Sequence, residues 1–310
     1  MKITMEELSD EAVCQLNMEY KKILRSREYL LGRKIYKFLY FLKKGKIRSI
    51  FLYLKSLSKE KKIKSLDKEN INYFTCRENE DISARIAVYT CLTRNYDILR
   101  EPLYRPENID YVVFTDMDIP KDSLWKKIDL NSIKDIAGLD HARKNRYIKL
   151  HPHEFFNDYM YSVYLDANIR IIGDLSKYIR CVGDKIPIAV NWHPSRNSIY
   201  TEAEVCCLKQ RDDPYVIQKQ IEGYRSEGMP DEFGLIEGGM IVRKHNQERC
   251  IRLMDLWWNE IKKKSARDQL SFPYAVWKMG CSMTDLGFIS KNIRNIDAIL
   301  LIPHGGLEIG

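Results

Sequence analysis

The chain has 310 residues, of which 45% are hydrophobic and 30% charged. This composition excludes a disordered chain and is typical of one large folded domain with an appendage. No run of about 18 uncharged apolar residues occurs, so no membrane-spanning helix is expected. The eight cysteines lack CxxC spacing and indicate free thiols in a reducing compartment, most of them in the core. The acidic first residues do not resemble a secretory signal, which favours a cytoplasmic location.

Positive charge is concentrated near the N-terminus. Residues 21–68 hold seventeen Lys and Arg residues against three acids, although the net charge of the whole chain is only +8. Apolar residues recur there at helical intervals, with Gly32 and Gly45 as expected breaks. These apolar residues are Ile23, Leu30, Leu31, Phe38, Phe41 and Leu42. We therefore predict two or three amphipathic helices in a basic extension over residues 1–75.

Several partners fit this extension. Basic and aromatic side chains suit an anionic membrane surface, where each basic residue contributes about 1 kcal/mol. The alternative is a helical hairpin packed on the main domain or on a second subunit, which would make an oligomer through these helices. Nucleic acid is disfavoured, because no recognisable nucleic-acid-binding module accompanies the basic tract.

Three apolar runs follow, at residues 85–92, 110–116 and 159–168, and a helical pattern separates the second from the third. Strands that alternate with helices predict an α/β domain with a mainly parallel sheet, here over residues 84–310. Ligands bind such sheets beyond the carboxyl ends of the strands. All three runs end in polar residues: Thr90 with Asn95 and Asp97, Thr115 with Asp116, and Asp166 with Asn168.

The third run suggests the chemistry of the site. Asp166 and Asn168 are two residues apart and can direct two oxygens to one side, which suits a divalent cation that carries phosphate oxygens. Arg143, Arg146 and Lys149 precede them at i, i+3 and i+6 of the helical segment, so they share one helix face. Such a basic face is typical of a solvated helix.

At this point the sequence resembles the nucleotide-sugar-dependent glycosyltransferases of the GT-A fold, with "YLDAN" in place of the usual D-x-D after the basic helix "RKNRYIK". Successive blocks over residues 84–304 resemble one glycosyltransferase family, formerly a domain of unknown function, of bacterial surface-polysaccharide loci and plant cell-wall enzymes. The blocks are "AVYTCLTRNYDILREP", "YVVFTD", "YLDANIRI", "WHPSRNSIYTEAE", "EGGMIVRKHN" and "RDQLSFPYAVWK". The resemblance implies a GT-A-like, Rossmann-like mixed sheet flanked by helices, and hexosyl transfer.

The resemblance also implies roles for the residues at the sheet edge. The nucleotide and sugar diphosphate of the donor, expected to be a UDP-sugar, would contact Thr90, Asn95, Tyr96, Asp97, Asp116, Arg143, Arg146, Lys149 and Asp166. A divalent cation, Mn²⁺ or Mg²⁺, would be held by Asp166, Asn168 and His304. Asn168 departs from the usual aspartate and contributes no charge, which puts the metal requirement in doubt. His304 can equally be an ordinary loop histidine.

The acceptor and the catalytic base are expected from the second half of the chain. The acceptor-binding residues would be His193, Arg196, Tyr200 and Gln269. Asp268 and Glu237 are the candidate bases of an inverting reaction, whereas a retaining enzyme lets the leaving phosphate take the proton. Asp268 can instead cap a helix. Gly238 and Gly239, expected just before a strand, either let a sugar approach the backbone or form a tight turn.

The combined expectation is a transferase on the inner face of the plasma membrane, held peripherally through residues 21–68. Its acceptor would be a growing capsular-type polysaccharide or a lipid-linked glycan. Two other classes remain open. A sugar-nucleotide nucleotidyltransferase would usually show a glycine-rich phosphate loop near its first strand, and "YTCLTRNYD" contains no glycine. A non-catalytic scaffold of a polysaccharide assembly would explain the missing second aspartate.

Overall fold

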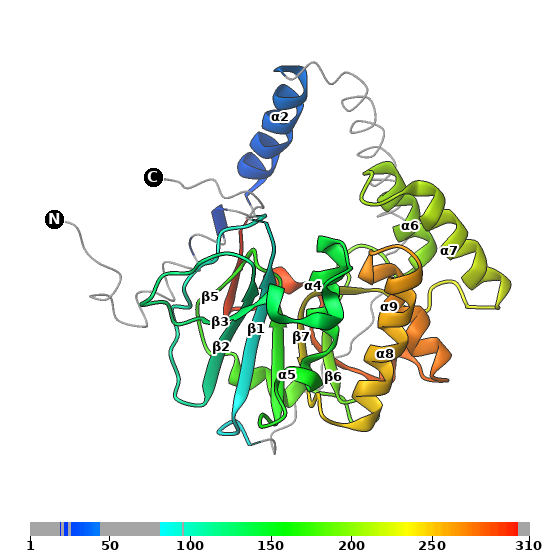
Figure 1. Ribbon diagram of the computed structural model, residues 1–310. Coiled ribbons are helices and arrows are strands. Elements are labelled where there is room, and N and C mark those ends of the chain that lie inside the picture. The colour runs from blue at the N-terminus through cyan, green and yellow to red at the C-terminus, as the bar shows by residue number, and fades with distance from the viewer. Residues whose placement is uncertain (1–18, 20–21, 24–25, 44–80, 95, 303–310) are drawn as a thin grey trace.

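The computed structural model describes residues 19, 22–23, 26–43, 81–94 and 96–302. In this part of the chain, residues 81–302 form a seven-stranded sheet with helices packed against it (Figure 1). The strand order is β3-β2-β1-β4-β7-β6-β8. The strands are β1 (Ile86–Leu92), β2 (Ile109–Thr115), β3 (Lys126–Asp129), β4 (Tyr161–Leu165), β6 (Ile188–Trp192), β7 (Ile236–Arg243) and β8 (Gly287–Ser290).

The sheet is mainly parallel. Strands β1 to β4 are parallel to their neighbours within that group, and β8 is parallel to β6. Strand β7 lies between β4 and β6 and runs antiparallel to both. The predicted mixed, mainly parallel α/β sheet flanked by helices is therefore confirmed, and its carboxyl edge carries the ends of β1, β2 and β4.

Strand β1 is buried on both faces of the sheet, and its successive residues contribute to different cores. Ala87, Tyr89 and Cys91 pack with α4 (His141–Leu150), α8 (Glu248–Lys263) and α9 (Asp268–Lys278). Ile86, Val88 and Leu92 point to the other face and pack with the 3-10 helix η4 (Ser176–Cys181) and strand β9 (Ile299–Leu301). A strand buried on both faces reads as a continuous apolar run, which explains why "IAVYTCL" lacks the alternation of an exposed strand.

A third apolar cluster joins α6 (Ile199–Leu208) and α7 (Pro214–Ser226) to α9. The remaining described elements are α5 (Pro152–Phe155), β5 (Ile169–Ile171), which pairs with β9, and the short 3-10 helices η2 (Leu130–Ser132), η3 (Lys134–Ile136), η5 (Met283–Asp285) and η6 (Ile293–Asn295). The six described cysteines are free, and four of them are buried: Cys91, Cys181, Cys206 and Cys250.

Of the basic extension, the structure describes mainly helix α2 (Arg27–Lys43). Leu31, Ile35 and Leu39 recur along it and are 58%, 50% and 55% exposed. The break expected at Gly32 is wrong, because Gly32 lies inside this helix, where a glycine costs about 1 kcal/mol relative to alanine without preventing the helix. Gly45 lies outside the described residues. No described helix is both long and apolar enough to cross a bilayer.

Candidate functional site

The loops after β1 and β2 meet at the carboxyl edge of the sheet. The backbone amide of Arg94 donates to Asp116 Oδ1 at 3.2 Å, which links the two loops. Thr90 and Asp97 are buried, at 2% and 5% exposure, whereas the ring of Tyr96 is 67% exposed. Asn95 lies outside the described residues. The predicted nucleotide-binding residues that are described thus share one edge.

The predicted basic face of α4 is divided in the structure. Asp140 caps the helix by accepting from the amide of Arg143. The guanidinium of Arg143 donates to the carbonyls of Ile261 and Lys264 at the C-terminal end of α8, so it lies away from its two neighbours on this face. Arg146 and Lys149 turn instead toward α9. Donor contact stays a prediction for all three residues, and the geometry supports it best for Arg146.

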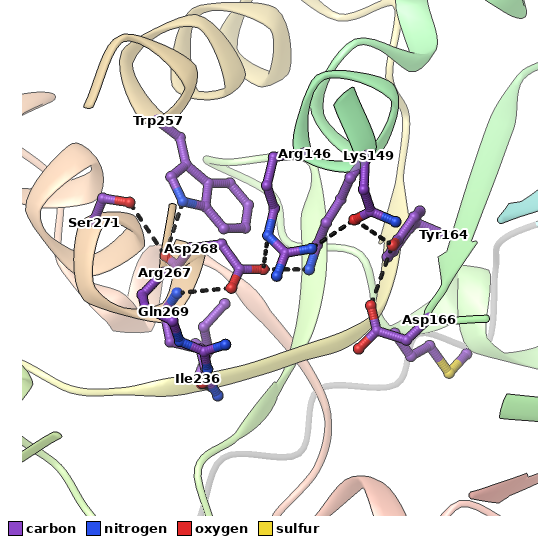
Figure 2. Close-up of polar contacts among 12 residues, drawn as sticks. Arg146, Lys149, Tyr164, Asp166, Ile236, Trp257, Arg267, Asp268, Gln269 and Ser271 are labelled. Atoms are coloured by element: carbon purple, nitrogen blue, oxygen red, sulfur yellow. Dashed lines mark hydrogen bonds and ion pairs between the residues drawn. The ribbon is translucent and has the colours of Figure 1, made fainter. Parts of the chain in front are cut away.

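Arg146 and Lys149 converge on the carboxylate of Asp268, the first residue of α9 (Figure 2). Lys149 Nζ lies 2.5 Å from Asp268 Oδ2, and Arg146 Nε lies 3.5 Å from the same oxygen. The side chain of Lys149 is only 1% exposed, whereas that of Arg146 is 19% exposed. Of the two cations, Arg146 is therefore the one with access to solvent.

More positive than negative charge surrounds Asp268. Burial alone would raise the pKa of its carboxyl, but Arg146, Lys149 and Arg267 outweigh burial and hold that pKa well below its usual range. Asp268 Oδ1 also accepts from the amide of Gln269, although the N-cap position of α9 is Arg267 and has no side-chain cap. Three cations face Asp268, and Asp166 also acts on Arg146, so these five groups carry one net positive charge, which suits an anionic ligand.

A hydrogen-bonded chain connects this cluster to Asp166. Tyr164 OH lies 3.1 Å from Asp166 Oδ1 and 3.4 Å from Asn145 Oδ1. Asn145 also accepts from Arg146 Nη1 at 2.5 Å and donates to the carbonyl of Cys91 at 2.8 Å. Sequence reasoning missed Asn145 and Tyr164. Their only signal was position, one residue before Arg146 and two residues before Asp166.

The glycine pair lies inside β7, not in a turn before a strand, so both the expected position and the tight-turn alternative are wrong. A Cβ on Gly238 would lie 3.0 Å from Lys149 Nζ, and one on Gly239 would lie 3.3 Å from Asp166 Oδ2. Successive residues of a strand face opposite sides. The pair therefore leaves room for Lys149 with Asp268 on one side of β7 and for Asp166 on the other.

The described part of the predicted metal site is incomplete. Asn168 Nδ2 donates to the carbonyl of Ile302 at 2.9 Å, and Oδ1 is the atom that the amide can offer to a metal ion. Asp166 adds one carboxylate, and His304 lies outside the described residues. No group of three described His, Cys, Asp or Glu side chains is arranged to hold a metal ion. Metal binding by Asp166, Asn168 and His304 stays a prediction.

Glu237 is the second predicted catalytic carboxylate. It lies on β7 next to Gly238, with its side chain 16% exposed. It accepts from the amide of Ile293 at 3.3 Å and from Arg294 Nη1 at 3.2 Å. Burial raises the pKa of Glu237, and Arg294 lowers it by a smaller amount. The pKa of Glu237 is therefore raised above that of an ordinary carboxyl, whereas the pKa of Asp268 is lowered below it.

Three of the predicted acceptor residues gather at the start of α6. Arg196 Nε lies 2.5 Å from Glu202 Oε2, and Arg196 Nη2 lies 2.9 Å from His193 Nε2. Tyr200 OH donates to the carbonyl of Met229, and its ring lines a groove of about 410 Å³ between α6 and α7. Gln269 lies elsewhere, beside Asp268, and its amide contacts Ile236 and Arg267.

The chain is similar to proteins of known classification. The family model "TOD1/MUCI70, glycosyltransferase-like domain" matches residues 65–296. The probable hexosyltransferase MUCI70 of Arabidopsis thaliana is 26% identical over 166 residues, which is 49% of this chain and 27% of that protein. The match with a solved structure of the bifunctional glycosyltransferase WbbM covers 71% of this chain and 41% of the WbbM chain, at 15% identity and a TM-score of 0.44. The chain thus spans less than half of either relative. Since the family model covers most of its length, the chain belongs to the TOD1/MUCI70 glycosyltransferase-like domain family.

Proposed function

We propose that this chain transfers a hexose from a nucleoside-diphosphate sugar to a glycan acceptor at the carboxyl edge of its sheet. The observation that carries the proposal is the surplus of positive charge around Asp268, where Arg146, Lys149 and Arg267 face one carboxylate. A diphosphate is the anionic group of the donor class that the family uses. It would neutralise this surplus.

Arg146 is the proposed diphosphate contact. Of the two α4 cations that face Asp268, Arg146 has the more exposed side chain, and Asn145 and Asp268 hold its guanidinium from two sides. Charge develops on the leaving diphosphate as the glycosidic bond breaks, and fixed cations in a poorly solvated site stabilise that charge strongly. Because Asp166 and Asn168 supply an incomplete ligand set, we assign most of this stabilisation to the arginine and lysine side chains, with Mn²⁺ or Mg²⁺ as an addition to be tested.

Glu237 is the proposed proton acceptor if the reaction inverts the sugar. A general base works best when its pKa lies near the operating pH. The pKa of Glu237 is raised toward that range by burial, whereas the pKa of Asp268 is held low by its cations. We therefore assign Asp268 to the orientation of Arg146 and Lys149, and the base to Glu237.

The identities of the donor and the acceptor are further parts of this proposal. A UDP-sugar is the proposed donor, and a lipid-linked or growing capsular-type surface glycan is the proposed acceptor. The exposed apolar side chains of α2 stand in a tract rich in Lys and Arg, which supports peripheral attachment to an anionic membrane surface at which such an acceptor is held. Contact of α2 with a second subunit is the alternative that the vesicle experiment below separates.

The test is binding and turnover with a panel of UDP-, GDP-, CMP- and TDP-sugars, with and without Mn²⁺. A ligand at 100 times its dissociation constant stabilises the fold by about 2.7 kcal/mol, a shift that thermal unfolding resolves. Arg146→Ala should lose this stabilisation, whereas Arg211→Ala, at an exposed position after α6, should keep it. Donor binding without hydrolysis or transfer would favour the scaffold. No binding to any donor would contradict the proposal.

A further inference from the structure

Arg243 is a fully buried arginine at the end of β7. Its Nη1 donates to the carbonyl of Lys149 at 2.8 Å, and its Nη2 donates to the hydroxyl of Tyr89 at 2.5 Å. Tyr89 OH donates in turn to the same carbonyl of Lys149 at 2.9 Å. Two side chains from two different strands therefore hold one backbone oxygen of α4.

The burial of Arg243 is unfavourable for the stability of the fold. Tyr89 and Arg243 are both 0% exposed, and no described carboxylate lies within ion-pair distance of Arg243. A buried cation without a carboxylate partner is costly. What compensates is the C-terminal end of α4, where Lys149 is the penultimate residue: its carbonyl is left without an intrahelical donor, and the helix dipole favours a positive charge there.

The residue whose backbone is held is the one whose side chain contacts Asp268. Lys149 Nζ lies 2.5 Å from Asp268 Oδ2 and 5.0 Å from the centre of the Tyr164 ring. A lysine side chain has several rotatable bonds, so the place of its ammonium depends on how firmly its backbone is held. A Cβ added at Gly238 would lie only 3.0 Å from that ammonium, so the lysine tip packs closely against β7 and has little room to move toward it.

We infer that Arg243 and Tyr89 are positioning residues of the donor site: they hold the backbone of Lys149 so that its ammonium orients Asp268, which in turn orients Arg146. This inference rests on the proposed function. Neither residue contacts the donor. Their effect on donor affinity passes through Lys149, which distinguishes them from residues that only stabilise the core.

The first variant is Tyr89→Phe, which removes one hydroxyl and leaves the packing. Tyr224→Phe is the matched control, since Tyr224 is equally buried and its hydroxyl bonds Gln220 on the same helix, α7, and Glu260 on α8. Unfolding temperature and the dissociation constants of UDP, GDP and TDP are measured for both. Tyr89→Phe should raise the dissociation constant of the nucleotide that the wild type binds by about 3- to 10-fold, which is the effect of one lost hydrogen bond. Tyr224→Phe should leave that affinity unchanged at a comparable loss of stability.

A double-mutant cycle tests the route of the effect. In a Lys149→Met background, Tyr89→Phe should weaken nucleotide binding no further, while its effect on the unfolding temperature persists. Arg243→Lys keeps the charge, cannot make both bonds and should behave like Tyr89→Phe, so the test survives if one variant fails to fold. If Tyr89→Phe weakens nucleotide binding equally in the wild-type and Lys149→Met backgrounds, the inference is wrong and the proposed function stands. The same holds if the wild type binds a nucleotide and Tyr89→Phe does not weaken that binding. A wild type that binds none of the three nucleotides overturns the proposed function and the inference together.

Discussion

The ammonium of Lys149 lies 2.5 Å from the carboxylate of Asp268, although 119 residues separate them in the chain. The contact joins α4 to α9 beside β7, and both side chains are almost fully buried. Asp268 is therefore the centre of the candidate site, because its single carboxylate organises Lys149 and Arg146 at once.

Asp268→Asn should destabilise the fold by about 3 to 5 kcal/mol, because it leaves the ammonium of Lys149 buried without its counter-charge. Urea unfolding measures the loss. Asp118→Asn is the control: its pair with Lys127 is on the surface, and its removal should change stability little. Adding Lys149→Met to Asp268→Asn should restore part of the stability. A double variant less stable than Asp268→Asn would contradict the ion-pair explanation.

Gly238→Ala should make the free energy of donor binding less favourable by more than it lowers the free energy of unfolding. The added Cβ would lie 3.0 Å from Lys149 Nζ and 3.4 Å from Asp268 Oδ2, so the tip of the lysine must shift by a few tenths of an ångström. Gly223→Ala is the matched control, because its Cβ in α7 would meet nothing within 4 Å and should stabilise that helix by about 0.5 to 1 kcal/mol. Calorimetric titration with the nucleotide found in the donor screen measures affinity. Unchanged affinity in Gly238→Ala would argue against a tightly packed site.

Glu237→Gln should lower kcat by about 10²- to 10⁴-fold while nucleotide binding stays within a few fold. A general base acts when deprotonated, and burial raises the pKa of Glu237. The rate of the wild type should therefore fall as pH decreases through this raised pKa, and the residual rate of the variant should lack that limb. Glu227→Gln removes an exposed carboxylate that pairs with Lys278 and serves as the control. Full activity in Glu237→Gln would exclude Glu237 as the base.

Acid should destabilise the protein through two buried histidines. Burial lowers the pKa of His151 and of His245 from 6.5 to about 4, and Arg243 adds to the effect in both. Between about pH 6.5 and 4 the unfolded chain binds protons that the folded protein does not, so stability falls as pH decreases through this window. The slope is at most about 1.4 kcal/mol per pH unit for each histidine.

Two isosteres check this assignment by pH-dependent urea unfolding. His151 Nδ1 contacts the carbonyl of Tyr147, and the side-chain amide of an asparagine can replace this nitrogen. His245 Nε2 contacts the carbonyl of Phe156, and the side-chain amide of a glutamine can replace that nitrogen. Each of His151→Asn and His245→Gln should flatten the slope between pH 6.5 and 4. A slope that persists in the double variant would assign the acid sensitivity to other groups.

Helix α2 should bind anionic vesicles if its exposed apolar residues face a membrane. Leu31→Glu with Ile35→Glu places charge on that face and should abolish cosedimentation with phosphatidylglycerol vesicles. Tyr215→Glu, at a 71% exposed position of α7, adds negative charge elsewhere and is the control. Binding to neutral vesicles as well would remove the electrostatic argument. A change of oligomeric state in the α2 variant, without vesicle binding by the wild type, would favour the second subunit.

Local patterns predicted the elements that are buried on both faces or capped. Strands β1, β2 and β4 and helix α4 lie where the apolar runs and the basic helix "RKNRYIK" were predicted. Strand β3 was not predicted, because "KKID" is mostly exposed and has no apolar run. It forms an edge strand by pairing with β2. The strand that contains Gly238 and Gly239 was expected to start later, since glycine pairs usually indicate turns. The residues that flank the pair, Glu237 and Met240, are paired with β6 and β4.

The sequence by itself determined the α/β class, and it predicted a site at the carboxyl edge of the sheet. These depend on local periodicity and on the general behaviour of parallel sheets. Tertiary structure decided which residues act together: it directed Arg143 to the end of α8, joined Lys149 to Asp268, and placed Arg243 and Tyr89 on the carbonyl of Lys149. Such contacts join side chains that are far apart in the chain, so their charges and distances follow from packing and leave no signal in any local pattern.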